Sequence, residues 1–106
     1  MLSSYALFLS IAKKFEQNFK DINKGSLLSN PAIEYRGRAF AYYKDDCMII
    51  KLSDNSSLEH LGIKAFRPAQ LLNRSHQHWY EIPSYYKMDW EQLGEAELRK
   101  LSGLSA

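Results

Sequence analysis

Residues 35–52, Tyr-Arg-Gly-Arg-Ala-Phe-Ala-Tyr-Tyr-Lys-Asp-Asp-Cys-Met-Ile-Ile-Lys-Leu, decide the fold of this chain. The apolar and aromatic runs 38–43 and 47–52 are separated by a tight acidic turn at Asp45-Asp46. This pattern predicts two β-strands that pair as an antiparallel hairpin. Because side chains alternate between the two faces of a strand, both faces of the hairpin receive apolar groups. One face must pack on the protein's own helices, and the other requires a second cover, such as a partner.

Alternation also predicts which side chains share a face. Phe40 and Tyr42 should point to one side of the first strand and Tyr43 to the other, while Ile49 opposes Ile50 on the second strand. A one-residue slip in register would exchange the two sets. We therefore expect either Phe40 or Tyr42 with Ile49, or Tyr43 with Ile50, to remain on an uncovered face.

Hydrophobic periodicity and turn residues predict the remaining elements. A helix is expected over residues 4–19, capped by Ser3 or Ser4, and followed by a turn-rich segment at 24–31. We further expect strands at 32–35, 64–67 and 76–82, a tight turn at Arg36-Gly37, a short helix ending at Leu61, a loop at 69–75, and a last helix from Asp89. The order α-β(3)-α-β(2)-α predicts a single two-layer α+β domain over residues 1–106, with one antiparallel sheet and the helices on one face.

The last helix contains one departure from a clean pattern. Residues 89–92 resemble a capping box, and Trp90, Leu93 and Leu101 share an apolar stripe. Glu97 falls inside that stripe. We expect its carboxylate at the rim of the stripe, reaching water or paired with a basic residue.

Composition places the chain among ordinary globular domains. Of its 106 residues 45% are hydrophobic, which suffices for one core, and the net charge of +2 is smaller than that of a dedicated nucleic-acid binder. The single cysteine, Cys47, excludes an internal disulfide and a Cys-rich zinc site. The apolar run 5–12 is shorter than the ~20 residues that span a bilayer and lacks the basic segment that opens a signal peptide. We therefore expect a cytoplasmic protein without a membrane partner.

No motif for catalysis or cofactor binding stands out. His76 and His78 should leave the same face of a strand, but a metal site needs further ligands that nothing places nearby. Cys47 adjoins the acidic turn Asp45-Asp46, which disfavours a thiolate nucleophile. A Gly-rich phosphate loop and a nucleophile elbow are both missing from the sequence. We therefore expect a protein without enzymatic activity, metal or cofactor.

Basic and aromatic side chains on the hairpin are the best candidates for an interaction surface. Large aromatic residues with few charges are typical of protein–protein interfaces, and a twofold homodimer is the simplest such assembly. The alternatives are a nucleic-acid-associated accessory domain that stacks bases on these rings, which the small net charge disfavours, and a small-ligand-binding protein. The candidate interaction residues are Arg36, Arg38, Phe40, Tyr42, Ile49, Lys51 and Trp79.

The order of short motifs from residue 35 onward resembles the N-terminal domain of the TfoX/Sxy family of bacterial competence regulators and the related YjbR-like small domains. The matching pieces are Gly37-Arg-Ala-Phe-Ala41, Cys47-Met-Ile-Ile-Lys-Leu52, Leu61-Gly-Ile-Lys-Ala-Phe66, Trp79-Tyr-Glu-Ile-Pro83 and the closing helix from Asp89, which together span roughly two-thirds of the chain. The resemblance implies the α-β(3)-α-β(2)-α fold and a non-enzymatic module, with transcriptional co-regulation in the best-known member. The Met-Phe-Gly-Gly-like turn of that family is absent, and the chain ends at Ala106 without its second domain. Only the fold and the non-enzymatic tendency are therefore expected to carry over.

Overall fold

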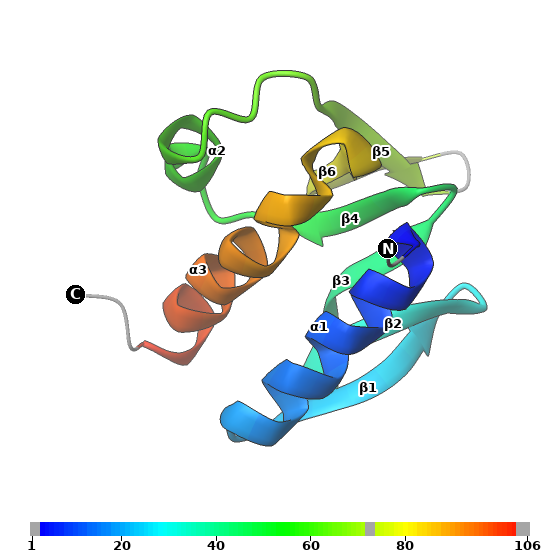
Figure 1. Cartoon of the computed structure of the whole chain (residues 1–106), viewed down its shortest axis with the longest axis vertical. Helices are drawn as coiled ribbons and strands as arrows, with labels where there is room; N and C mark the ends of the chain where they lie inside the picture. The colour runs from blue at the N-terminus through cyan, green and yellow to red at the C-terminus, as the bar shows by residue number, and fades with distance from the viewer. Residues whose placement is uncertain (1–2, 72–73, 104–106) are drawn as a thin grey trace.

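A computed structural model describes residues 3–71 and 74–103 of the chain, with side chains described outside residues 70–77. Three α-helices, one 3-10 helix and six strands make up this part of the chain (Figure 1). In chain order the elements are α1 (Ser4–Asn18), β1 (Ile22–Leu27), β2 (Asn30–Tyr35), β3 (Arg38–Lys44), β4 (Cys47–Lys51), α2 (Ser56–His60), β5 (Arg67–Leu71), β6 (Arg74–Pro83), η1 (Ser84–Asp89) and α3 (Trp90–Ser102).

The strands form one antiparallel sheet in the order β1-β2-β3-β4-β6-β5. Helices α1 and α3 lie side by side against the same face of this sheet (Figure 1). The structure thus confirms the expected α+β class with one antiparallel sheet. The sheet has six strands rather than the expected five.

The strand that the sequence did not predict is β1, which takes up the first half of the segment 24–31 that was expected to be turn-rich. It pairs with β2 through a two-residue turn at Leu28-Ser29, where both residues have positive φ, 53° and 67°. Such a turn normally requires Asn, Asp or Gly, which adopt positive φ at lower cost than other residues. Leu-Ser carries no such signal, whereas the turns at 36–37 and 45–46 do and were predicted correctly.

The second hairpin also differs from the expectation. β5 spans Arg67–Leu71 instead of 64–67, and β6 begins at Arg74, so most of the expected loop at 69–75 belongs to paired strands. Pro68 predicts a strand end because proline cannot donate a ladder hydrogen bond. It lies instead within β5, at the edge of the sheet, where one side of the strand needs no partner.

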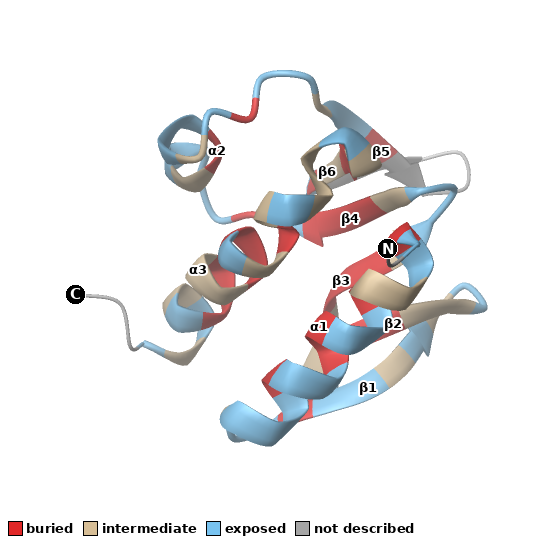
Figure 2. Ribbon diagram, viewed as in Figure 1, coloured by how far each residue is buried: buried red, intermediate tan, exposed pale blue. Residues whose placement is uncertain are grey.

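The main core lies between the helices and the sheet, and all three helices contribute to it (Figure 2). Phe8, Ile11, Ala12 and Phe15 form the buried stripe of α1, as the periodicity predicts. Ser3 caps α1 by accepting the Ala6 N–H at 3.1 Å. This helix-side core fixes which face of the sheet is left without helices.

A β-bulge in β3 changes the distribution of side chains over the two faces. Ile33 pairs with Ala41 but Glu34 pairs with Ala39, so Phe40 has no partner on β2. The extra residue lets Phe40 and Ala41 both enter the helix-side core, while Tyr42 points to the opposite face. The expectation that Phe40 and Tyr42 share a face is therefore wrong.

The start of α3 is at the expected place but is built differently. Asp89 is the N-cap residue, yet its side chain makes no capping hydrogen bond. Its backbone has helical angles (φ −100°, ψ −6°) because η1 runs directly into α3, whereas a capping residue normally has extended angles. The expected capping box is therefore not formed.

Candidate functional site

Two regions contain residues that the sequence singled out. The first is the helix-free face of the sheet, called here the outer face, whose buried residues all come from strands: Ala32, Tyr42, Ile49, Ala69 and Trp79. The second is a cavity between β3 and β4, on the helix side. Across residues 3–71 and 74–103, no helix is long and apolar enough to cross a membrane.

The apolar side chains of the outer face are shielded within the single chain. Tyr42 is 2% exposed, Ile49 3% and Trp79 7%. The Tyr42 and Trp79 rings pack together with centroids 5.6 Å apart and planes tilted by 56°. Ile49 pairs in register with Tyr42 on one side and Glu81 on the other. The expectation that Tyr42 and Ile49 remain on an uncovered face is therefore wrong, while the homodimer remains a prediction.

In place of a flat patch, this end of the sheet has two adjoining hollows. A more polar one, of about 130 Å³, is lined by Tyr42, Lys44, Asp45, Cys47, Ile49, Arg67 and Glu81. A more apolar one, of about 310 Å³, is lined by Cys47, Ala65, Phe66, Arg67, Glu81 and Pro83. The two hollows share Cys47, Arg67 and Glu81, so they form one continuous surface, called here the double hollow.

An ion pair stands where the two hollows meet. The Arg67 guanidinium donates to the Glu81 carboxylate at 2.9 Å, and the Arg67 side chain remains 81% exposed. Register explains the pairing, because Arg67 of β5 lies directly opposite Glu81 of β6. Neither residue is among those that the sequence singled out. Glu81 carries one local signal, its two-residue spacing from Trp79 on the same strand, and Arg67 carries none.

Two protonatable groups of the double hollow have raised pKa values. Burial, and then the Glu81 carboxylate, raise the pKa of the Cys47 thiol above its ordinary 9.0. The same two causes raise the pKa of the Tyr42 hydroxyl. A thiol with a raised pKa is a poor nucleophile at neutral pH. The surface therefore offers hydrogen-bonding and apolar groups suited to binding.

The two arginines predicted as interaction residues lie apart from the double hollow. Arg36 lies in the β2–β3 turn and Arg38 directly follows it, at the opposite end of β3 from Lys44. Arg36 is paired with Asp21 at 3.3 Å, and its guanidinium lies over the Tyr35 ring at 5.3 Å from the centroid. The structure thus brings Tyr42, Ile49 and Trp79 together but separates both arginines from them.

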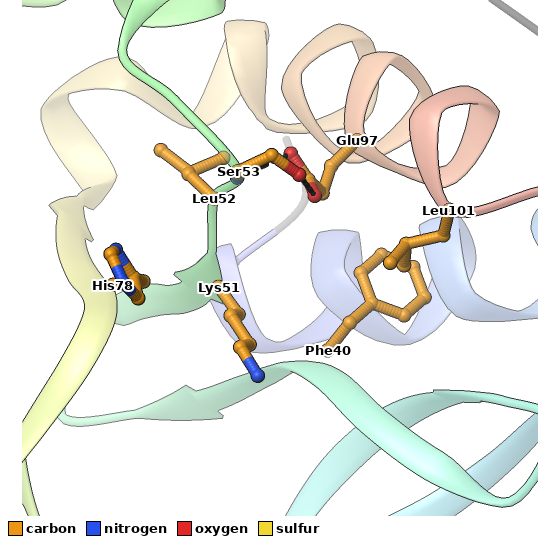
Figure 3. Close-up of a pocket in the computed structure, with 7 residues that line it drawn as sticks. All are labelled: Phe40, Lys51, Leu52, Ser53, His78, Glu97 and Leu101. Carbon is orange, nitrogen blue, oxygen red and sulfur yellow. Dashed lines mark hydrogen bonds between the residues drawn. The ribbon is translucent and has the colours of Figure 1, made fainter.

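The remaining predicted residues, Phe40 and Lys51, line the cavity on the helix side (Figure 3). Pairing between β3 and β4 ends at Ala41 and Ile50, and beyond this point β4 stays with β6. The strands diverge and leave a cavity of about 160 Å³. Its lining residues are Phe40, Lys51, Leu52, Ser53, His78, Glu97 and Leu101.

Glu97 is the unexpected member of this cavity. It is 2% exposed, and its two carboxylate oxygens accept hydrogen bonds from the Ser53 N–H at 3.1 Å and the Ser53 hydroxyl at 2.7 Å (Figure 3). The expectation of a carboxylate at the rim, reaching water or paired with a base, is therefore wrong. Its position inside the apolar stripe of α3 was the sequence signal for a special environment, but Ser53, its partner, carried none.

Metal binding finds no support in the side chains that the structure describes. No three His, Cys, Asp or Glu residues among them lie close enough together to hold a metal ion. His78 lies at the cavity with positive φ, 68°, while the side chain of His76 falls outside the described residues. The expected pairing of these two rings on one face is thus not described.

No family model matches this chain, and neither a curated protein nor a solved structure matches it. The resemblance to the TfoX N-terminal domain therefore remains a prediction. A function for this chain has to be inferred from the geometry of the outer face and of the cavity.

Proposed function

We propose that this domain is a small, non-enzymatic interaction module of regulatory type that binds a segment of another protein in the double hollow. The observation that carries the proposal is the pair of adjoining hollows that share the Arg67–Glu81 ion pair. Because its apolar walls lie next to a charged pair, the surface can take an apolar side chain and a polar or charged one from the same partner segment.

Three further features support a binding role. All helices contribute to the opposite face, so nothing in the described chain packs on the outer face as a helical layer (Figure 1). The raised pKa of the Cys47 thiol argues against nucleophilic chemistry in the double hollow. The Arg67 head group is largely exposed and can exchange its partner without loss of core packing.

The proposal is tested by selecting binders from a random peptide library and mapping them by amide chemical-shift changes. We expect the selected peptides to shift residues around Cys47, Arg67 and Glu81. Arg67→Glu should abolish this binding, because it places two carboxylates opposite each other across β5 and β6. Arg99→Glu is the matched control, since Arg99 also forms an exposed ion pair, with Glu95, but on α3.

Other results would contradict the proposal. Peptides that shift only α1 or α3, or that bind Arg67→Glu as well as the unchanged protein, would place the interaction elsewhere. Single-stranded DNA or RNA that binds the domain, with affinity falling steeply between about 50 and 200 mM salt, would favour the nucleic-acid alternative instead.

A further inference from the structure

The cavity between β3 and β4 contains a buried carboxylate without a cationic partner. Among the described side chains no ion pair to Glu97 is present, and its only hydrogen bonds there come from Ser53. A carboxylate has about four lone-pair directions, so the two bonds from Ser53 leave each oxygen able to accept another. A buried carboxylate whose hydrogen-bond partners are all neutral keeps part of its desolvation cost, and a cation that enters the cavity would reduce that cost.

We propose that this cavity binds a small primary amine, with its ammonium group on Glu97. The walls on either side of the carboxylate are apolar, formed by Phe40, Leu52 and Leu101 (Figure 3). They suit the hydrocarbon part of such a ligand, and the Phe40 ring also favours a neighbouring cation. The ammonium would form charge-assisted hydrogen bonds to the carboxylate oxygens.

The size of the cavity sets the size of the ligand. Its volume of about 160 Å³ is close to the ~150 Å³ of an engineered protein cavity that admits benzene. A ligand of about six non-hydrogen atoms therefore fills the space. Longer amines must project past Leu101, which is 42% exposed at the edge of the cavity.

The mouth of the cavity selects among amines. Lys51 is an exposed lining residue, so its charge is partly screened by salt and should affect binding less than the buried Glu97 carboxylate does. A second positive charge on the ligand would meet Lys51, which disfavours diamines. A carboxylate at the far end would be attracted there, so an amino acid with a short chain should bind more tightly than a simple alkylamine.

The experiment titrates the protein with four probes of equal chain length and follows amide chemical shifts. n-Butylamine and 4-aminobutanoate should shift residues around Phe40, Leu52 and Ser53, with 4-aminobutanoate binding more tightly. 1-Butanol and butyrate should bind at least about tenfold more weakly, because they lack the ammonium group. Similar affinity for n-butylamine and 1-butanol, tighter binding of butyrate than of n-butylamine, or no shifts with either amine would overturn the proposal.

Variants distinguish ligand binding from a purely structural role of Glu97, which fixes the backbone at Ser53. Glu97→Gln keeps the shape and should weaken n-butylamine at least about tenfold. Glu95→Gln, two residues away on the exposed surface of α3, should leave the affinity unchanged. Unchanged affinity in Glu97→Gln would overturn the proposal. If Glu97→Gln fails to fold, Leu101→Trp is the second test. A tryptophan at this half-exposed position should narrow the mouth of the cavity and block the binding of both amines. Undiminished binding of the amines to Leu101→Trp would also overturn the proposal.

Discussion

The two faces of the sheet bury their apolar side chains in different ways. On the helix side, large aliphatic and aromatic side chains from three helices and the strands interlock in one core. On the outer face, the buried residues that the structure describes all lie on strands, and the Tyr42 and Trp79 rings pack against each other. A face without helices can therefore be dry, but it has hollows and charges at its surface.

The largest expected effect on stability comes from a substitution in the helix-side core. Phe15 is 1% exposed and its ring reaches α3, where the nearest ring carbon is 3.0 Å from the position of a Cβ on Gly94. Phe15→Ala should lower the free energy of unfolding by about 3 to 5 kcal/mol, because the cavity lies between two helices that cannot both close on it. Urea denaturation measures this loss, and Ser10→Ala on the exposed side of α1 is the control. A loss below about 1 kcal/mol would mean that the helices do not pack as described.

Trp79→Ala should have a smaller effect on the outer face. We expect a loss of about 2 to 3 kcal/mol, because water and neighbouring side chains can fill part of the space where no helix lies above. Trp79→Phe should restore part of the loss by keeping a ring against Tyr42. The same urea titrations rank the two faces directly. A loss equal to that of Phe15→Ala would show that the outer face is as tightly packed as the core.

The smallest expected effect concerns the polar contacts of Asp54, which follows the end of β4 on the helix side. Asp54 accepts hydrogen bonds from the Ser56 hydroxyl and N–H and pairs with Lys100 of α3, and these contacts lower its pKa from 3.8 to about 2. A lowered folded-state pKa stabilises the fold above pH 3.8 and loses this effect as the pH falls towards about 2. Asp54→Asn should therefore be less stable than the unchanged protein at neutral pH, with the gap narrowing in acid. An equal gap at both pH values would contradict the assignment.

The parts of the fold that follow from local sequence were predictable. The stripe of α1 and the turns at 36–37 and 45–46 carry their own periodicity or turn chemistry. The Leu28-Ser29 turn does not, so only the pairing of β1 with β2 reveals this strand. In the same way, the sequence predicted that a strand ends at Pro68. No local pattern shows that Pro68 lies at the sheet edge, where a proline is tolerated within a strand.

The candidate sites were predictable only in part. Alternation correctly set Ile49 apart from Ile50, and the structure places Tyr42, Ile49 and Trp79 together. The alternation of side chains could not predict which face Phe40 occupies, because the bulge in β3 depends on the register between β2 and β3. Arg67 and Ser53 were missed since their roles come from contacts with Glu81 and Glu97, 14 and 44 residues away.

The sequence by itself determined the α+β class, the central hairpin and the presence of apolar groups on both of its faces. These depend on the period of side chains along one strand or helix, which is a local property. Only the tertiary structure decided that the outer face is dry and hollowed, that Phe40 turns to the helices, and that Glu97 is buried against Ser53. These outcomes depend on strand register and on which distant side chains meet, and no local pattern records them.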